Sequence, residues 1–287
     1  MKVTARAKVN LYLHIGPVRP DGYHNLQTVF HSISLADNIR LELSPTLDLA
    51  CSDPTVPTGE ANTCYQAAMK LREAARTTQG ASIYIEKAIP TQAGLGGGSA
   101  DAAACLVGLN ALWHTGLGVE ALEEIGAKIG ADVPFCIRGG AAYAEGIGDK
   151  LRPLPPLANW IVVLKPDVAI STRLAYAELD LRAAWPAPGP ESILAAMKSG
   201  ILPRLAPVLY NDFEMVALEL YPEVYQAYQV LSTSCSGVLL SGSGSALFGL
   251  AVDEREARRI AHDLLEGGWC AWASRLVGAG VVVEDGA

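Results

Sequence analysis

A glycine-rich segment in the first third of the chain has the composition of an anion-binding loop. It reads PTQAGLGGGSA and lies between a short apolar run at 83–85 and an alanine-rich stretch. Glycine lets backbone N–H groups approach an anion closely, and the N-terminus of a following helix adds about half a positive charge. A tight turn that needs positive φ would also use glycine, but four glycines in five positions favour a phosphate cradle. Its predicted residues are Pro90, Thr91, Gln92, Ala93, Gly94, Leu95, Gly96, Gly97, Gly98, Ser99 and Ala100.

Two common nucleotide-binding loops do not fit this segment. A P-loop ends in Lys followed by Ser or Thr, and this segment contains no lysine. A dinucleotide-binding loop belongs to a strand–helix–strand unit with an acidic residue after the second strand. Here the pattern continues as helix on helix, over 100–113 and 119–129, so a dinucleotide site is disfavoured.

Lys8 and Asp132 are the candidates for the chemistry on a phosphoryl acceptor. Taken alone, Lys8 could be a solvated strand lysine, and Asp132, between Gly130-Ala131 and Val133-Pro134, could be a turn or capping residue. A carboxylate can accept the proton of a hydroxyl, and a nearby ammonium keeps it ionised and offsets charge on the transferring phosphoryl group. With a phosphate loop in the same chain, we favour the catalytic interpretation.

The segment at 90–100 resembles the second motif of the GHMP kinases, the superfamily of galactokinase, homoserine kinase, mevalonate kinase and phosphomevalonate kinase. Lys8 and Asn10 on an N-terminal strand, 130–134 after a helix, and Gly242-Ser243-Gly244 resemble the other motifs, so the likeness runs from residue 8 to about 250. The resemblance implies that 90–100 wraps the phosphates of ATP, the co-substrate together with Mg²⁺. It also implies that Lys8 and Asp132 are catalytic.

Asp21-Gly22-Tyr23-His24, followed by Leu26-Gln27-Thr28, resembles one branch of this superfamily. The resemblance implies ATP-dependent phosphorylation of the 2-hydroxyl of 4-diphosphocytidyl-2-C-methyl-D-erythritol, a step of the non-mevalonate isoprenoid pathway. It implies that Tyr23 stacks on the cytosine and that His24 reads the polar edge of the base. The other implied substrate contacts are Tyr176 on the opposite face of the base, Asn10 and Thr172.

Other interpretations of these motifs stay open at this point. Tyr23 could be a packing residue at a loop rim, and Asn211-Asp212 could be a helix cap or a ligand contact. The chain could be a homoserine or mevalonate kinase, although those acceptors have no base to stack on a tyrosine. It could also be a non-catalytic nucleotide-binding regulator, but binding alone would require neither Lys8 nor Asp132.

The metal ligands are left open by the sequence. Ser99 could offer its hydroxyl to Mg²⁺ or to a phosphate, and it could cap the helix that follows. Glu145 and Asp149 are further candidates. Magnesium held mainly by ATP phosphates and water needs few protein ligands.

The elements that position these residues form an α+β pattern. Alternation at 2–15 predicts a strand with Val3, Ala5, Ala7, Val9, Leu11, Leu13 and Ile15 on its buried face. The proline-rich 152–156 predicts a linker, and 183–190 predicts an irregular loop. Other expected strands are 26–35, 39–43, 83–85, 160–164, 238–240, 246–252 and 270–277; further helices are 62–74, 172–179, 191–199, 211–219, 222–233 and 254–265. The resemblance implies a ribosomal-protein-S5-like domain at 1–153 and a ferredoxin-like α/β sandwich at 154–287.

Composition and charge restrict the classes of protein to which this chain can belong. Of 287 residues, 50% are hydrophobic, which excludes disorder for the bulk of the chain. Lys and Arg number 22 against 30 Asp and Glu, which disfavours sequence-independent nucleic-acid binding. There is no signal-like N-terminus and no apolar run approaching the roughly 18 residues of a membrane helix. Six dispersed cysteines suit a reducing compartment. We expect a cytoplasmic small-molecule enzyme, without nucleic-acid or membrane partners, that is a monomer or weak homodimer.

Overall fold

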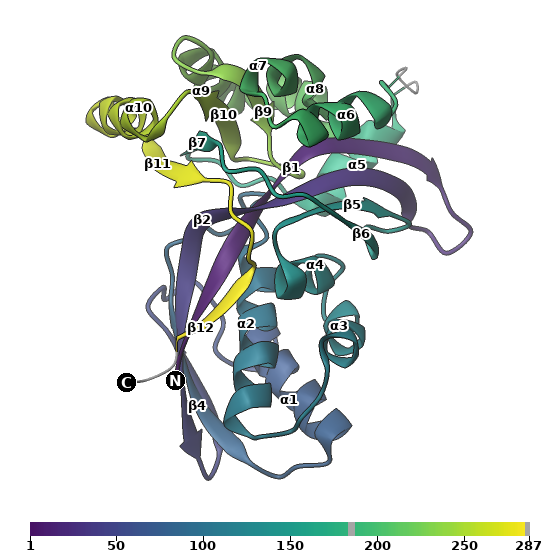
Figure 1. Cartoon of the computed structure of the whole chain (residues 1–287), viewed down its shortest axis with the longest axis vertical. Coiled ribbons are helices and arrows are strands. Elements are labelled where there is room, and N and C mark those ends of the chain that lie inside the picture. The colour runs from purple at the N-terminus through teal and green to yellow at the C-terminus, as the bar shows by residue number, and fades with distance from the viewer. Residues whose placement is uncertain (183–186, 285–287) are drawn as a thin grey trace.

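The protein folds into two β-sheets with helices packed against them (Figure 1). The structure is a computed structural model that describes residues 1–182 and 187–284. In the first sheet the order is β12-β1-β2-β4-β3; β5 pairs with β2 and β6, and β8 pairs with β1. Its strands are β1 (Lys2–Val18), β2 (His24–Ser44), β3 (Leu47–Cys51), β4 (Gly80–Glu86), β5 (Ala141–Glu145), β6 (Lys150–Leu154), β8 (Tyr210–Asn211) and β12 (Val281–Glu284).

The alternation predicted for the first strand is confirmed. All seven apolar side chains from Val3 to Ile15 are buried. Lys8, Asn10 and Tyr12 on the other face are buried as well, although their side chains are polar. The central part of β1 is therefore enclosed on both faces, and burial of a lysine and an asparagine there requires polar partners.

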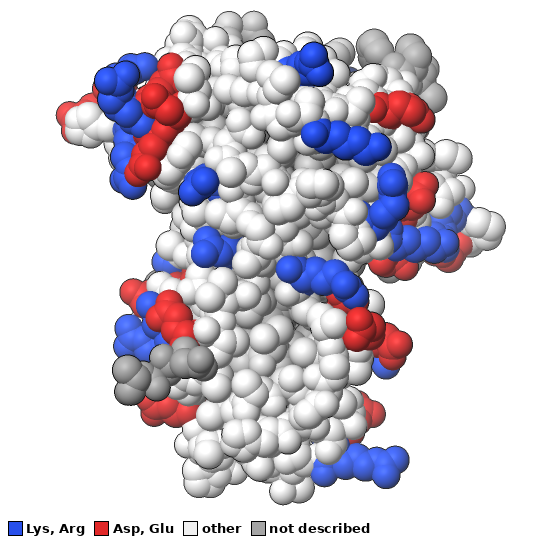
Figure 2. Space-filling model, in the orientation of Figure 1, with Lys and Arg blue, Asp and Glu red and all other residues white. Residues whose placement is uncertain are grey.

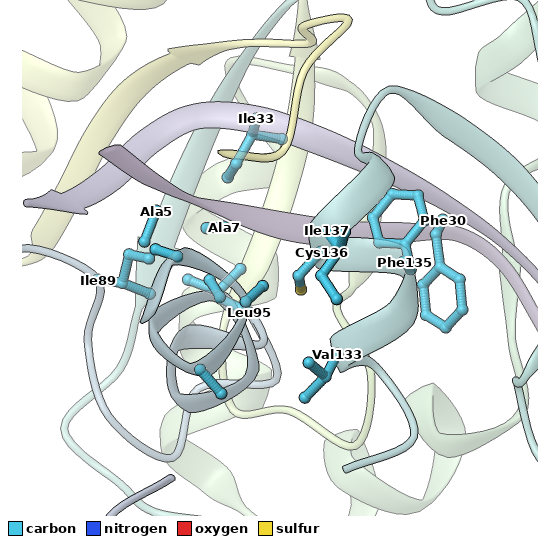
Figure 3. Packing of buried hydrophobic residues seen from close by; sticks show 14 of the residues in the cluster. Ala5, Ala7, Phe30, Ile33, Ile89, Leu95, Val133, Phe135, Cys136 and Ile137 are labelled. Carbon is cyan, nitrogen blue, oxygen red and sulfur yellow. The ribbon is translucent and has the colours of Figure 1, made fainter. Parts of the chain in front are cut away.

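Three helices pack against the first sheet: α1 (Thr63–Ala75), α2 (Gly97–Leu112) and α4 (Val133–Arg138). A further helix, α3 (Val119–Ala127), packs against these three. Figure 1 shows α2 directly beside the long strands. Figure 3 shows Leu95 in one buried cluster with Val133 and Phe135 of α4. α2 lies so close to the sheet that a Cβ at Gly108 would come within 2.4 Å of a Leu41 methyl carbon. This close packing holds the C-terminal part of α2 against the sheet.

The second sheet confirms the expected ferredoxin-like arrangement. Its order is β11-β7-β10-β9, with β7 (Trp160–Lys165), β9 (Ser236–Leu240), β10 (Leu247–Ala251) and β11 (Cys270–Arg275). All three pairings are antiparallel. Its helices are α5 (Thr172–Asp180), α6 (Glu191–Ser199), α7 (Leu202–Leu205), α8 (Asp212–Leu220), α9 (Pro222–Ser232) and α10 (Glu254–Glu266), and a 3₁₀ turn covers Ala206–Val208. The first strand is joined to the second through helices, and α10 joins the last two.

Several elements differ from the sequence-based expectations. The strands expected at 26–35 and 39–43 are one strand, β2, which continues because the buried Asp37 is satisfied by hydrogen bonds. The expected linker at 152–156 overlaps β6, where proline is tolerated because β6 pairs on one side only. The sequence-based expectations did not include β3, β5, β8, β12, α4 and α7. Residues 183–186 of the expected loop at 183–190 lie outside the described residues.

The expected boundary between 153 and 154 stays a prediction. β6 before it belongs to the first sheet and β7 after it to the second. Two strands from the C-terminal half nevertheless pair with β1: β12 in antiparallel and β8 in parallel register. These pairings tie the C-terminal half of the chain to the strand that carries Lys8.

Charged residues of both signs are interspersed on the face shown in Figure 2. On α10, Arg258 pairs with Glu254 at 2.7 Å and Arg259 with Asp263 at 2.9 Å. Within the described part of the chain, no helix has the length and apolar character needed to cross a membrane.

Candidate active site

The glycine-rich loop is held between β1 and the β9–β10 hairpin. The Lys8 N–H donates to the Leu95 carbonyl at 2.9 Å, and the Ala246 N–H donates to the Ala93 carbonyl at 3.1 Å. The Ser241 hydroxyl donates to the Gly94 carbonyl at 3.1 Å. At Gly94 φ is +75°, and a Cβ there would come within 2.0 Å of the Ser241 carbonyl oxygen, so glycine alone fits. The loop and the hairpin therefore form one unit.

A cavity of about 290 Å³ runs along this loop. The helix begins at Gly97 with Gly96 as its N-cap, so the first turn of α2 is made by the loop itself. Ser99 lies inside this turn and is not the cap, because Gly96 takes that position in the left-handed conformation with φ +71°. The cavity is lined by Thr63, Lys87, Pro90, Thr91, Gln92, Ala93, Gly94, Leu95, Gly96, Gly97, Gly98 and Ser99. It therefore gathers the predicted loop except Ala100, which is buried, and adds Thr63 and Lys87, which sequence analysis missed.

A buried charge cluster closes the base of this loop. The Lys87 ammonium lies 2.5 Å from Asp37 Oδ2 and 2.8 Å from Asp101 Oδ2. Asp37 also accepts the N–H groups of Ala88 and Ile89 through Oδ1. Burial raises the pKa of Asp101 to about 8, with the Asp37 charge adding to the shift and Lys87 opposing it. The Lys87–Asp101 pair thus joins the two ends of the loop. A charged residue within the apolar sequence of α2 was the available signal for it.

Lys8 and Asp132, which are far apart in the sequence, meet at the other side of the loop. The Lys8 ammonium lies 3.3 Å from Asp132 Oδ2, and the Lys8 side chain is almost fully buried while Asp132 is 30% exposed. Lys8 also donates to Asn10 Oδ1 at 2.8 Å, and the Asn10 amide donates to the Thr28 hydroxyl at 2.8 Å. The ring of Phe30 lies 5.4 Å from the Lys8 ammonium. The lysine is held rigidly, and the carboxylate remains accessible.

Asp132 stands at the N-cap of α4, but its side chain makes no capping hydrogen bond. The capping interpretation therefore does not account for its carboxylate, which faces Lys8 instead. An accessible carboxylate beside a buried ammonium can accept a proton from a hydroxyl and keep that oxygen oriented.

A second cavity, of about 270 Å³, opens over this pair and shares Gly94 and Gly96 with the first. The Thr172 hydroxyl is 2.8 Å from the Ser243 hydroxyl, which joins the start of α5 to the glycine hairpin. Asn211 caps α8 by accepting the Phe213 N–H, and its amide donates to the carbonyls of Leu240 and Gly242. The cavity is lined by Lys8, Asn10, Leu13, Leu26, Thr28, Phe30, Gly94, Gly96, Asp132, Thr172, Tyr176, Phe213, Gly242 and Ser243.

The predicted base-binding residues are only partly brought together. The rings of His24 and Tyr176 stack with centroids 4.9 Å apart. Burial raises the pKa of Tyr176 to about 12, and the nearby Asp132 charge adds to the shift, so the phenol is neutral. Tyr23 is 61% exposed, and its backbone N–H donates to Asp21. Tyr176 thus stacks on His24, and the placement of a base between Tyr23 and Tyr176 stays a prediction.

A third cavity, of about 540 Å³, lies beside His24. It is lined by His14, Ile15, Gly16, Pro17, Val18, His24, Leu179, Asp180, Arg182, Ala187 and Asp212. His24 Nδ1 donates to the Gly16 carbonyl at 3.0 Å, because a carbonyl can only accept, and Nε2 lies 3.3 Å from Asp180. Sequence analysis did not single out His14, and it left Asp212 undecided between a helix cap and a ligand contact.

The other two metal candidates have partners in the β5–β6 hairpin. Asp149 accepts the Ile147 N–H at 3.1 Å, and Glu145 accepts the Tyr143 hydroxyl at 3.4 Å. Among residues 1–182 and 187–284, no group of three or more His, Cys, Asp and Glu side chains is arranged to hold a metal ion.

Comparison with known proteins identifies the class to which this fold and site belong. The family described as the GHMP kinases N terminal domain matches residues 62–140, and GHMP kinases C terminal matches residues 193–268. A homoserine kinase crystal structure from Cytophaga hutchinsonii has a TM-score of 0.79 at 20% identity, covering 99% of this chain and 97% of its own, which shows the fold alone. The chain has the fold of a GHMP kinase and matches the family models of both GHMP kinase domains.

More similar relatives narrow this class. The 4-diphosphocytidyl-2-C-methyl-D-erythritol kinase of Gloeobacter violaceus is 40% identical over 99% of this chain and 97% of its own. That of Carboxydothermus hydrogenoformans is 44% identical over 92% of this chain and 93% of its own. A crystal structure of 4-(cytidine 5'-diphospho)-2C-methyl-D-erythritol kinase has a TM-score of 0.82 at 38% identity, covering 97% of this chain and all of that one. The chain belongs to the 4-diphosphocytidyl-2-C-methyl-D-erythritol kinase family.

Proposed function

We propose that this enzyme transfers the γ-phosphoryl group of ATP to the 2-hydroxyl of 4-diphosphocytidyl-2-C-methyl-D-erythritol, in the non-mevalonate route to isoprenoid precursors. The observation that carries the proposal is the Lys8–Asp132 pair, with 3.3 Å between Nζ and Oδ2, at the junction of two cavities. One cavity follows the glycine loop and the other opens on the acceptor side, so donor and acceptor would meet above the pair.

The two side chains would divide the work on the acceptor. Asp132 would accept the proton of the hydroxyl and direct its oxygen toward the phosphorus. Phosphoryl transfer through a loose transition state needs positioning more than a strong base, so a carboxylate suffices. Lys8 would keep Asp132 ionised and offset negative charge on the transferring group. Asn10, which binds the Lys8 ammonium, would contact the acceptor.

The loop at 90–100 would hold the triphosphate of ATP, with the first turn of α2 facing it. Mg²⁺ would be held mainly by phosphate oxygens and water, which fits a site with few acidic side chains, and Ser99 in this turn is the protein group we propose beside it. Magnesium would supply charge neutralisation on the phosphates. The chain's own part is to orient the two reactants and keep the acceptor carboxylate in place.

The acceptor's cytidyl group would occupy the cavity beside His24. His24 would read the polar edge of the base, Tyr176 and Tyr23 would supply aromatic surface, and Thr172 would contact the ligand from the start of α5. These contacts give the reason to favour a cytidyl acceptor over homoserine or mevalonate, which offer no base. We further propose a cytoplasmic enzyme that is a monomer or weak homodimer.

The decisive experiment measures ADP release from ATP and Mg²⁺ with three acceptors in parallel: the cytidyl compound, homoserine and mevalonate. We expect turnover with the cytidyl compound alone. Turnover with another acceptor would keep the phosphate loop and discard the base pocket. ATP binding without turnover on any acceptor would favour a nucleotide-binding regulator.

A further inference from the structure

Asp212 holds the imidazole of His14 in one orientation at the wall of the 540 Å³ cavity. His14 Nδ1 lies 2.8 Å from Asp212 Oδ2, and Asp212 is only 10% exposed. The same carboxylate accepts the Ile15 N–H at 2.6 Å and the Tyr210 hydroxyl at 2.5 Å. A carboxylate anchored by three donors from β1 and β8 moves little, so it fixes the ring that it binds.

This contact also decides which nitrogen carries the proton. An ionised carboxylate can only accept, so the neutral ring keeps its proton on Nδ1 and exposes a lone pair on Nε2. Among the described residues, Asp212 is the hydrogen-bond partner of the His14 side chain, through Nδ1. The His14 side chain is 30% exposed. The free acceptor belongs to a ring that lines the cavity.

A carboxylate in the lining adds a second hydrogen-bond acceptor. Asp180 lines the cavity, and His24 Nε2 lies 3.3 Å from it, so this nitrogen of His24 faces an acceptor and is not a free acceptor itself. Arg182, the cation in the lining, is already paired with Glu219 at 2.6 Å. The Nε2 lone pair of His14 and the carboxylate of Asp180 favour a ligand that brings hydrogen-bond donors rather than another anion.

We propose that His14 is a specificity-determining residue that accepts a hydrogen bond from the nucleoside part of the acceptor, and that Asp212 is its positioning residue. The proposal rests on the proposed function, since it takes the cytidyl group to occupy this cavity. Two donors in that group have the required chemistry: the exocyclic amine of cytosine and the 2′-hydroxyl of the ribose. A uridyl analogue lacks the amine and a 2′-deoxycytidyl analogue lacks one hydroxyl, so the two sources can be separated.

The test compares steady-state kinetics of the whole enzyme with those of two variants. His14→Asn keeps an N–H for Asp212 but has no group at the Nε2 position, whereas His14→Gln can place its amide oxygen there. His14→Asn should raise KM for the cytidyl substrate about five- to tenfold, the effect of one neutral hydrogen bond, with kcat and KM for ATP unchanged. His14→Gln should recover part of the loss. His262→Asn, on the exposed face of α10, is the matched control and should leave all three constants unchanged.

The analogues test the same point without relying on how a variant folds. The wild type should bind one of the two analogues about five- to tenfold less well than the natural substrate, and His14→Asn should no longer discriminate against that analogue. A His14→Asn enzyme with unchanged KM, or with wild-type discrimination against both analogues, would overturn the role of His14 while leaving the proposed function standing. A wild type that binds ATP but does not turn over the cytidyl compound would overturn the proposed function, and this inference with it.

Discussion

The proposed nucleotide side and the proposed acceptor side of this site are built from different parts of the chain. The cavity proposed for the nucleotide is lined almost entirely by one continuous segment, 90–99, in which glycines allow backbone to approach backbone. The cavities proposed for the acceptor are lined by side chains from β1, β2, α5 and α8, segments far apart in the sequence. A backbone cradle suits the phosphates that every nucleotide shares, whereas converging side chains can distinguish one acceptor from another.

The two sides also handle charge differently. On the nucleotide side, Lys87 is enclosed between Asp37 and Asp101, so its charge is neutralised inside the protein. On the proposed acceptor side, Asp132 is partly exposed, and Asp212 contacts His14 at the wall of the 540 Å³ cavity. Substitutions on the nucleotide side should therefore change ATP affinity and stability, and those on the acceptor side should change turnover or acceptor KM.

Asp132→Asn should give the largest effect. The amide cannot accept the proton of the acceptor hydroxyl, so kcat should fall about 10²- to 10⁴-fold, the range for loss of a general base. ATP affinity should stay near that of the wild type, because Asp132 does not line the nucleotide cavity. Single-turnover kinetics and ATP titration measure the two quantities. Asp263→Asn, which breaks an exposed ion pair on α10, is the control and should leave both unchanged. Normal turnover by Asp132→Asn would remove the base assignment.

Gly96→Ala should weaken ATP binding on the nucleotide side. Here φ is +71°, and the new Cβ would lie 3.0 Å from Lys8 Cγ, so loop and lysine must move apart. We expect KM for ATP to rise at least about tenfold, as for a misplaced positioning element. Gly116→Ala is a matched control, because φ is +69° and nothing lies within 4 Å of the added Cβ. Both variants should lose about 1 kcal/mol of stability. Equal KM values for ATP in the two variants would show that Gly96 serves the backbone alone.

The contrast between the two sides explains what the sequence could predict. Features contained in one short segment were predictable: the alternation of β1, the glycine loop and the helix after it. The pairing of β12 with β1 was not, because β12 has only four residues and lies about 280 positions from its partner. Tyr23 was placed in a stacking role by resemblance alone, and its exposure leaves that role a prediction.

The roles of buried polar residues were also not predictable from the sequence. In the sequence, Asp101 is a small residue within a predicted helix, and Asp37 lies between two predicted strands. In the folded protein both carboxylates contact Lys87. His14 sits on the polar face of an alternating strand, where solvent exposure is the ordinary expectation. Each gains its role from a partner at least 14 positions away, Lys87 for the two aspartates and Asp212 for His14. Local pattern can show that a charge interrupts an apolar segment, as Asp101 does in α2, but it does not identify the partner.

Tyr23→Ala tests whether aromatic surface contributes to the acceptor side. If Tyr23 closes over the base when substrate binds, its loss should raise KM for the cytidyl substrate by about tenfold, near the lower end of base stacking, with kcat nearly constant. Tyr225→Ala, an exposed tyrosine on α9, should change neither constant. An unchanged KM in Tyr23→Ala would leave His24 and Tyr176 as the aromatic groups of the pocket.

Asp101→Asn should have the smallest effect on activity and a clear effect on the pH dependence of stability. Burial raises the pKa of Asp101 to about 8 in the folded protein, whereas an unfolded aspartate titrates near pH 4. Between these values the folded state holds a proton that the unfolded state has released. Wild-type stability should therefore fall with rising pH by about 1 kcal/mol per unit relative to the variant, which has no proton to release there.

The advantage of Asp101→Asn should thus grow from pH 5 to pH 8 and stay level above that, since both states of the wild type are then ionised. Urea unfolding of the two proteins at pH 5.5, 7 and 8.5 measures the difference. Asp263→Asn on exposed α10 should show no such trend. A constant difference across this range would mean that Lys87 keeps Asp101 ionised throughout. The charge cluster beneath the nucleotide loop would then carry a net negative charge facing the phosphates. In that case the charge on the nucleotide side would not be neutralised inside the protein, and the two sides would not differ in this respect.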